Sequence, residues 1–550
     1  MRQFVRNFLR GDQRPLVMVA RNVSSRYIAI LVETIVGLVM LPFNIAHLGP
    51  SAYGLWMLTA SVTIHFSVLD LGYGGSLVKF VAQYRARRNT RALNEIASTL
   101  FFVFAAVGCL AYLVAIGVAF NLDAVFRLTP EQAQIGKWLL LIIGVHVALN
   151  FPFSIYGGIV SGFQRYDINS LVAIVVATVV ALVNVSVLLA GYGLVTLVAA
   201  TTSVRVLGYL VYRANARRIF PELHLTPRLF RRARLREVTG FSVYSSIIDW
   251  ANKLNYQIDQ VVIGIFLGAA PVAVWAVAVR IISATQRLTN QLNGVLFPMI
   301  VDSHATLKQQ RLQQILLEGT RLSLTMVMTI VIGLLLLAEP LVRAWVGRPE
   351  LMGSALLIQI LAIAVVFRVG GATSTTLLKG SDRHRMLAGV NLATALVNVG
   401  LSIVLIRRFG LPGVAVGTLV PLGVTAMFVT FPAACRRVDL PIGRALQHSV
   451  IPALWPATVV LVAGSMLLPR LESPTLLHVG AQALAAALLY LAIVFGVAIG
   501  RRDRAAYLTR LSELTGAARS ANTGGETKSA PDLTTREDTA GESRQPALRT

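Results

Sequence analysis

Basic and amide side chains recur along one face of a long apolar segment in the middle of the chain. Arg280, Arg287, Asn290 and Gln291 follow one another at the spacing of one or two helical turns. On a helix this spacing aligns the side chains. The segment contains no acidic residue that can pair with either arginine, so the pattern predicts electrostatic binding of a ligand rather than an ion pair within the helix.

The preceding apolar segment carries a second polar stripe. Asp249, Lys253 and Gln257 follow at helical spacing, so Asp249 and Lys253 suit an ion pair as well as they suit a ligand site. Glu33 lies near the centre of the first apolar segment, and Arg26 precedes it by two turns on a similar face. Because Lys253 and Glu33 lie at matching depth, we expect a water-filled, net cationic cavity inside a helical bundle.

Other charged residues stand alone in apolar segments, where a charge costs about 2.5–3.5 kcal/mol at mid-bilayer. For Arg205 and Arg368, ligand binding is favoured slightly over ion pairs between helices. Glu33 and Asp259 have two open roles, neutralisation of neighbouring bases and transfer of a coupling proton or ion. His146 is isolated, and a satisfied polar contact is favoured over a proton relay.

The composition is that of an integral membrane protein. The chain has 550 residues, of which 55% are hydrophobic and 14% charged, whereas soluble domains average about 25% charged residues. The formal net charge is +25, but the basic residues do not cover a polar surface as they do in a nucleic-acid-binding protein. The two cysteines, Cys109 and Cys435, exclude a disulfide scaffold.

About 14 apolar runs reach the ~20 residues that a bilayer-spanning helix needs. Because backbone groups in lipid must be satisfied internally, we predict an all-α bundle. Tight hairpins are expected at 191–193 and 268–271. Basic residues concentrate in every second connection, which places both termini in the cytoplasm. The expected spans are 24–47, 52–74, 96–120, 138–160, 168–190, 194–213, 241–267, 272–298, 322–345, 353–377, 386–406, 411–434, 446–468 and 476–499.

The first twelve runs form an internal repeat. The sequence 181–185 recurs at 395–399, each time between a short basic loop and a Gly-Leu hairpin. An even number of helices per copy gives both copies the same orientation, which predicts two six-helix lobes related by a pseudo-twofold axis along the membrane normal. The expected divisions are a cytoplasmic amphipathic N-terminus at 1–23, an N-lobe at 24–213, a basic cytoplasmic linker at 214–240, a C-lobe at 241–437, two further helices at 438–500, and a mostly disordered cytoplasmic tail at 501–550.

The motifs that the sequence lacks disfavour an enzyme. It has no Walker loop and no HExxH, CxxC or GxSxG motif, so no metal, cofactor or catalytic residue is expected. The longest outside loop, at 121–137, is too short for the domain that membrane-embedded polymerases use.

At the N-terminus, arginines alternate with apolar residues, which fits an amphipathic helix on anionic lipids and a solvated basic tail equally well.

Several stretches resemble one family of transporters. Leu48–Trp56 followed by Leu69–Gly74 is similar to the first-hairpin signature of lipid-linked oligosaccharide flippases. These form the polysaccharide-transporter branch of the multidrug/oligosaccharidyl-lipid/polysaccharide exporter superfamily. Gly162–Asp167 resembles the loop after their fourth helix, and Asp259–Ile281 resembles their helix 7–8 segment. The order and spacing of these motifs over about residues 24–437 carry the resemblance.

The resemblance implies a central cavity and alternating access between two lobes. Its implied substrate is an oligosaccharide on an undecaprenyl phosphate or diphosphate, moved across the bacterial inner membrane for exopolysaccharide or O-antigen-type export. Polymerase and export machinery are further expected partners. By resemblance, Arg280 is a cavity-lining basic position, and Arg26 and Glu33 lie in a region where charges matter. Arginine binds phosphate with two parallel hydrogen bonds, which suits this head group.

Two other transport functions stay open. A peptidoglycan-precursor flippase has the same expected helix count and differs in being essential for growth. A cation-coupled drug or metabolite antiporter needs a cavity dominated by acids, whereas bases outnumber acids in the stripes found in this sequence. An enzyme of polymer assembly is the least favoured alternative.

Overall fold

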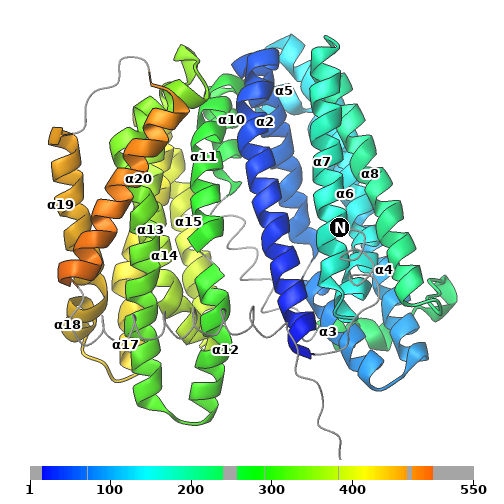
Figure 1. The fold of residues 1–550 in the computed structure, drawn as a ribbon. Helices are drawn as coiled ribbons and strands as arrows, with labels where there is room; N and C mark the ends of the chain where they lie inside the picture. Colours follow the sequence, from blue (N-terminus) through cyan, green and yellow to red (C-terminus); the bar gives the residue numbers. More distant parts are fainter. Residues whose placement is uncertain are drawn as a thin grey trace, which may run out of the picture. The chain divides into compact units, whose positions relative to one another are not determined.

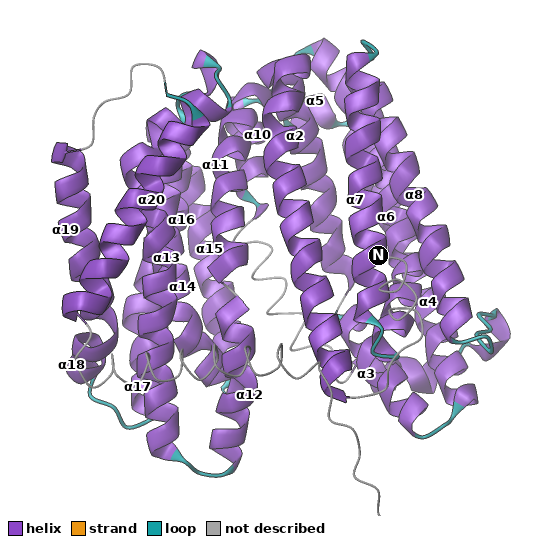
Figure 2. Ribbon diagram, in the orientation of Figure 1, coloured by secondary structure: helices purple, strands orange, loops and turns teal. Residues whose placement is uncertain are grey.

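A computed structural model of the chain describes residues 15–70, 72–239, 257–289, 291–381, 383–467 and 474–498. Throughout these ranges the regular elements are helices and none is a strand (Figure 2), which confirms the all-α prediction. The chain divides into compact units at residues 1–494 and 495–550. The first unit is described below. Residues 1–14 of the amphipathic N-terminus expected at 1–23 lie outside the described residues, as does the tail expected at 501–550.

The helices follow one another with short connections (Figure 1). Twelve helical stretches of the described residues are long and apolar enough to cross a membrane, and the span expected at 241–267 is described only from residue 257. The helices are α2 Pro15–His65, α3 Tyr73–Ala86, α4 Thr90–Phe120, α5 Leu122–Val125, α6 Pro130–Gly162, α7 Tyr166–Leu189, α8 Leu194–Ile219, α10 Asp259–Leu267, α11 Ala269–Thr289, α12 Gln291–Ala305, α13 Gln309–Trp345, α14 Ser354–Gly380, α15 His384–Phe409, α16 Leu411–Val424, α17 Phe431–Arg437, α18 Ile442–Ala445, α19 Ile451–Leu467 and α20 Leu476–Ile493.

Helix α2 contains the first two expected spans, joined at a kink. Gly49 has φ +79° and ψ 162° inside an otherwise helical stretch. A side chain at this φ is strained, whereas glycine is not. Pro50 follows directly and cannot donate a backbone hydrogen bond to the preceding turn. The two spans therefore meet at a single residue instead of at a loop.

Several helices differ in length from the apolar runs that predicted them. The second span is shorter than expected, because it ends at His65 instead of at 74 and Phe66–Asp70 forms a 3₁₀ turn before α3. Helix α13 begins at Gln309 instead of 322. The span expected at 272–298 is divided between α11 and α12. An apolar window finds only the part of a helix that lies in lipid, and polar turns at either end continue the helix without any change in backbone.

Two groups of helices meet at α2. In the first group α4, α6, α7 and α8 pack against one another, and in the second α13, α14, α15 and α16 do so. Helix α2 packs against α6 and α7 of the first group and against α11, which itself packs on α14 (Figure 1). Close approach of α2 to α11 requires Gly54, since a side chain there would overlap the carbonyl oxygen of Ala269. Such small-residue contacts are typical of membrane helices.

One pair of turns at equivalent positions of the internal repeat has a similar backbone conformation. Gly49 and Gly268 have φ values of +79° and +87°, whereas Gly193 and Gly410, which precede the equivalent leucines, have φ values of −81° and +61°. The last pair forms the hairpins between α7 and α8 and between α15 and α16. The two copies of the central repeat motif lie in α7 and α15, and each helix packs on the one that follows it. These similarities agree with a duplicated six-helix unit.

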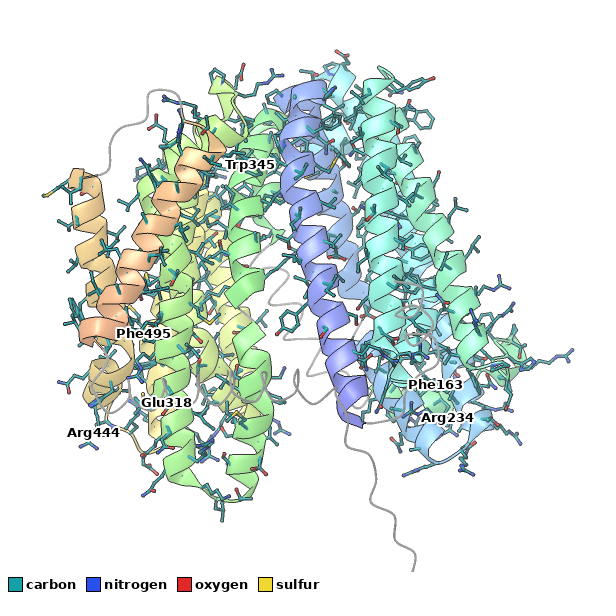
Figure 3. All side chains as sticks on the ribbon, viewed as in Figure 1. Phe163, Arg234, Glu318, Trp345, Arg444 and Phe495 are labelled. Atoms are coloured by element: carbon teal, nitrogen blue, oxygen red, sulfur yellow. The ribbon has the colours of Figure 1, made fainter. Side chains whose placement is uncertain are left out.

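The segment after α8 is fixed along α4 by polar contacts. Arg234 donates to the hydroxyl of Tyr84 at 2.7 Å and forms ion pairs with Glu95 at 3.3 Å and Glu237 at 3.1 Å. Burial and the hydrogen bond to Glu237 raise the pKa of Tyr84. Arg234 lies at the opposite end of the helices from Trp345 (Figure 3). The linker expected at 214–240 thus begins inside α8 and is bound to the surface of α3 and α4.

Candidate functional site

Arg280 lies where α11 packs on α2. A Cβ atom at Gly37 of α2 would be 2.7 Å from Nη1 of Arg280, so the guanidinium rests directly on the helix backbone. The side chain is half-buried, and the phenol of the buried Tyr53 interacts with it. The structure therefore places Arg280 between the two helix groups, with its orientation set by Gly37 and Tyr53.

Arg287, two turns further along α11, forms an ion pair with Glu33 of α2. Nη1 of Arg287 lies 3.8 Å from Oε2 of Glu33, and the side chains remain 46% and 42% exposed. An ion pair of this length between accessible side chains is weak. We call Arg280, Arg287, Glu33, Gly37 and Tyr53 the α2–α11 basic face. It combines two guanidinium groups with one carboxylate that is weakly paired to Arg287.

A second polar group faces Glu33 from α6 and α8. Arg205 is exposed and interacts electrostatically with Glu33 and Tyr209. The hydroxyl of Tyr209 lies 2.9 Å from Nδ1 of His146 and 3.1 Å from Oδ1 of Asn150. His146 therefore has the satisfied polar contact expected for it. Glu33 consequently interacts with arginines of both helix groups.

Arg368 is held at the contact between α14 and α11. Its Nη1 donates to Oε1 of Gln286 at 2.7 Å. Gln286 precedes Arg287 in the chain, so the second helix group supplies two neighbouring basic side chains, one on each of these helices. The acceptor in this contact is the oxygen of an amide side chain.

Asp259 begins α10 and is buried in the second helix group, with 3% of its surface exposed. Its Oδ2 accepts a hydrogen bond from Thr418 of α16 at 3.2 Å. Its Oδ1 is buried and accepts none from a described residue. Leaving a carboxylate in this setting without a positive partner is costly. A proton or a bound cation would remove that cost.

Of the remaining residues predicted to bind substrate or balance its charge, the structure describes some and leaves the others outside its described ranges. Arg26 lies exposed on α2, and no other described residue pairs with it. The carbonyl oxygen of Gln257 accepts from Ser61 at 3.1 Å, which brings it beside α2. Gln291 is the first residue of α12, and its side chain is not among those described. The residues that lie wholly outside the described ranges are Asp249, Lys253 and Asn290.

Two further side chains bind α2 just before its kink at Gly49, at the end of the bundle away from Arg234. Pro42 and Pro50 have no N–H to donate to the carbonyl groups of Leu38 and Ala46, which precede them by one helical turn. Nε1 of Trp345 donates to the oxygen of Leu38 at 3.1 Å (Figure 3). Nη2 of Arg348 donates to the oxygen of Ala46 at 3.0 Å. We call these two hydrogen bonds the α2 latch.

Sequence periodicity missed the neighbours that complete the site. Gln286 lies beside the basic stripe of α11 and not on it, and Tyr53 belongs to a different helix. Trp345 and Arg348 come from the end of α13 and the turn after it. The sequence did indicate that donors such as these are needed, because the prolines of α2 leave two carbonyl groups without their usual N–H partners. Within the described residues no group of acidic, histidine or cysteine side chains is arranged to hold a metal ion.

Comparison with known proteins identifies relatives over most of the chain. Residues 19–304, more than half of its length, match the family described as polysaccharide biosynthesis protein. A probable flippase, AglR, of Haloferax volcanii is 22% identical over 74% of this chain and 82% of its own. A putative O-antigen transporter of Shigella flexneri is 20% identical over 70% of this chain and 90% of its own.

Solved structures with the same fold are also found. The lipid II flippase MurJ in an inward closed conformation superposes with a TM-score of 0.64 and 12% identity over 87% of this chain and 99% of its own. An inward-facing multidrug resistance MATE family transporter gives 0.62 and 15% identity over 76% and 98%. These likenesses establish the fold that the resemblance implied. The chain belongs to the polysaccharide biosynthesis protein family and has the fold of the multidrug/oligosaccharidyl-lipid/polysaccharide exporter superfamily.

Proposed function

We propose that this protein is a flippase that moves oligosaccharides linked to undecaprenyl phosphate or diphosphate across the bacterial inner membrane for polysaccharide export. The family and the relatives named as flippase and O-antigen transporter support transport rather than catalysis. The observation that carries the proposal is the α2–α11 basic face, where Arg280 and Arg287 meet α2 within an apolar bundle. Guanidinium groups are suited to the phosphate of a lipid carrier.

The weak ion pair with Glu33 gives Arg287 a partner when no substrate is bound. Without substrate, Glu33 neutralises part of the charge of Arg287 at 3.8 Å. A phosphate group carries more negative charge and several acceptor oxygens, so it displaces the carboxylate from the guanidinium. Arg205 and Arg368 add positive charge from the first and second helix groups. Movement of the two groups about this site exposes it to each side of the membrane in turn.

Asp259 is our proposed coupling residue. Its buried carboxyl group needs a proton or a cation, and it lies in α10, directly before α11 in the chain. Gain or loss of that ion changes the charge balance of the second helix group. Transport is thereby linked to an ion gradient, with Glu33 serving for charge balance at the substrate site.

The orientation follows from the distribution of basic residues. Both termini are cytoplasmic in this proposal, and the end of the bundle that carries Arg234 faces the cytoplasm. The α2 latch then lies on the outer side. A closed outer end leaves the α2–α11 basic face to receive substrate from the inner leaflet.

Arg280→Ala and Arg287→Ala test the proposal in cells that depend on this protein for polysaccharide export. Each change removes charged hydrogen bonds worth about 1.5–3 kcal/mol, so we expect export to fall at least tenfold while lipid-linked oligosaccharide accumulates in the inner leaflet. The control is Arg408→Ala, which removes an exposed arginine at the end of α15. Normal export by both site variants, at normal protein levels, would rule out phosphate binding at this face.

A peptidoglycan-precursor flippase is the second candidate, favoured by the fold match over 87% of the chain with the lipid II flippase. Depletion of the protein separates the two candidates. Loss of a surface polysaccharide with normal growth supports the first. Growth arrest with accumulation of the peptidoglycan precursor supports the second.

A further inference from the structure

A cavity of about 240 Å³ lies away from the α2–α11 basic face, beside the end of α8. Its apolar lining comes from Phe101 of α4, from Phe153 and Tyr156 of α6, and from Leu223 and Leu225 in the segment that follows α8. The cavity therefore has walls from three helices and one connecting segment. No part of the proposed transport site contributes to it.

Hydrogen bonds from α4 hold the connecting segment in place. Asn94 donates to the carbonyl oxygen of Glu222 at 2.8 Å and accepts from the N–H of His224 at 2.9 Å. Ser98 donates to the carbonyl oxygen of His224 at 3.1 Å. These contacts fix the backbone on both sides of Leu223, which is buried. The apolar wall is thus formed before any ligand binds.

Two arginines in the last turns of α8 complete the lining. Arg213 and Arg217 lie four residues apart and both border the cavity. Neither forms an ion pair with an acidic side chain of the described residues, and both interact electrostatically with Tyr156. Like charges at this spacing on a helix repel each other. An anion between them would replace that repulsion with two attractions.

We propose that this cavity binds the head group of an anionic phospholipid from the cytoplasmic leaflet. The end of α8 lies at the cytoplasmic surface in the orientation predicted from the charges, and basic pockets between helices on this side are suited to anionic head groups. The arginines face the phosphate, while the aromatic and leucine side chains contact the glycerol and the first carbons of the acyl chains. A volume of 240 Å³ is below the usual range of ligand pockets, which suits a lipid head group better than an oligosaccharide diphosphate.

The test is lipid binding to the purified full-length protein, measured by native mass spectrometry with phosphatidylglycerol and with phosphatidylcholine. Removing both positive charges in R213Q/R217Q should weaken phosphatidylglycerol binding roughly 30-fold, or about 2 kcal/mol for two arginines near the membrane surface. Binding of phosphatidylcholine should not change. The single substitution Arg217→Glu, at an exposed position, should give a similar loss and guards against misfolding of the double variant.

The matched control is R218Q/R228Q, which removes two exposed arginines of the same region that do not line the cavity. Its affinity for phosphatidylglycerol should stay within about twofold of the original. An equal loss in both double variants would show a general effect of charge and overturn the proposal. So would equal binding of the two lipids, or complete displacement of phosphatidylglycerol by millimolar inorganic phosphate, which would indicate a site for a free anion.

Discussion

At the level of single residues, Glu33 is notable because it interacts with arginines from both helix groups. It forms the 3.8 Å ion pair with Arg287 of α11 and interacts with Arg205 of α8. In the function that we propose, a carboxylate between arginines of two helix groups lowers the attraction of the site for an anionic substrate. The same carboxylate then keeps the substrate from binding too tightly to be released.

Glu33→Gln should therefore strengthen substrate binding and slow release. An exposed ion pair contributes about 0.2–1 kcal/mol, so we expect up to about fivefold tighter binding of undecaprenyl diphosphate to the purified protein, together with reduced export. Native mass spectrometry measures the first quantity and polymer yield the second. The double variant E33Q/R287A should lose the gain. Unchanged binding in Glu33→Gln would contradict this role.

Asp259→Asn keeps the shape of the buried side chain but cannot carry a negative charge. If the carboxyl group transfers a coupling ion, export should stop while the melting temperature does not fall, because an amide is less costly to bury than an unpartnered carboxylate. Thr418→Val is the control, since it removes the 3.2 Å hydrogen bond but leaves the carboxyl group. Export at the normal rate by Asp259→Asn would exclude Asp259 from coupling.

At the level of elements, the prolines inside α2 determine which of its backbone groups need partners from other helices. A proline inside a helix removes a hydrogen bond that the backbone in lipid must replace. The α2 latch provides donors for both carbonyl groups from the end of α13 and the turn after it. Local sequence predicts the need for these donors, but which distant residues meet it depends on packing between helix groups.

Trp345→Phe should destabilise the protein by at least about 0.5–1.5 kcal/mol, because phenylalanine keeps an aromatic ring but cannot donate to the oxygen of Leu38. The lower melting temperature of the purified protein checks this. Trp455→Phe is the matched control, since Trp455 lies partly exposed on α19. Equal melting temperatures for Trp345→Phe and the original protein would show that the hydrogen bond adds nothing.

At the level of the whole molecule, the sequence predicted the helical bundle, most spans and the basic face of α11, because hydropathy and helical spacing act locally. Two helix ends were misplaced for different reasons. Helix α13 begins at Gln309 because its polar first turns continue the helix beyond the apolar run, whereas the second span ends at His65 because a 3₁₀ turn interrupts the helix inside the apolar run. The sequence left open that Glu33 neutralises a neighbouring base, but its pairing with Arg287 and the contact of Arg280 with Gly37 depend on the packing of α2 on α11 and could not be predicted.

In the alternating-access cycle that we propose, the α2 latch also sets the ratio between the populations of two conformers. A conformer that parts α2 from the end of α13 loses two hydrogen bonds, together about 1–3 kcal/mol, which disfavours it by roughly 5–150-fold. In the orientation proposed, the outward-closed conformer is therefore the more populated one in the absence of substrate. W345F/R348Q should populate the outward-open conformer more, seen as fewer cross-links between cysteines placed on α2 and α13. Substrate has to supply the same energy by binding the outward-open conformer more tightly. A flippase with this latch would open to the outside mainly when substrate is bound, which limits the passage of other solutes.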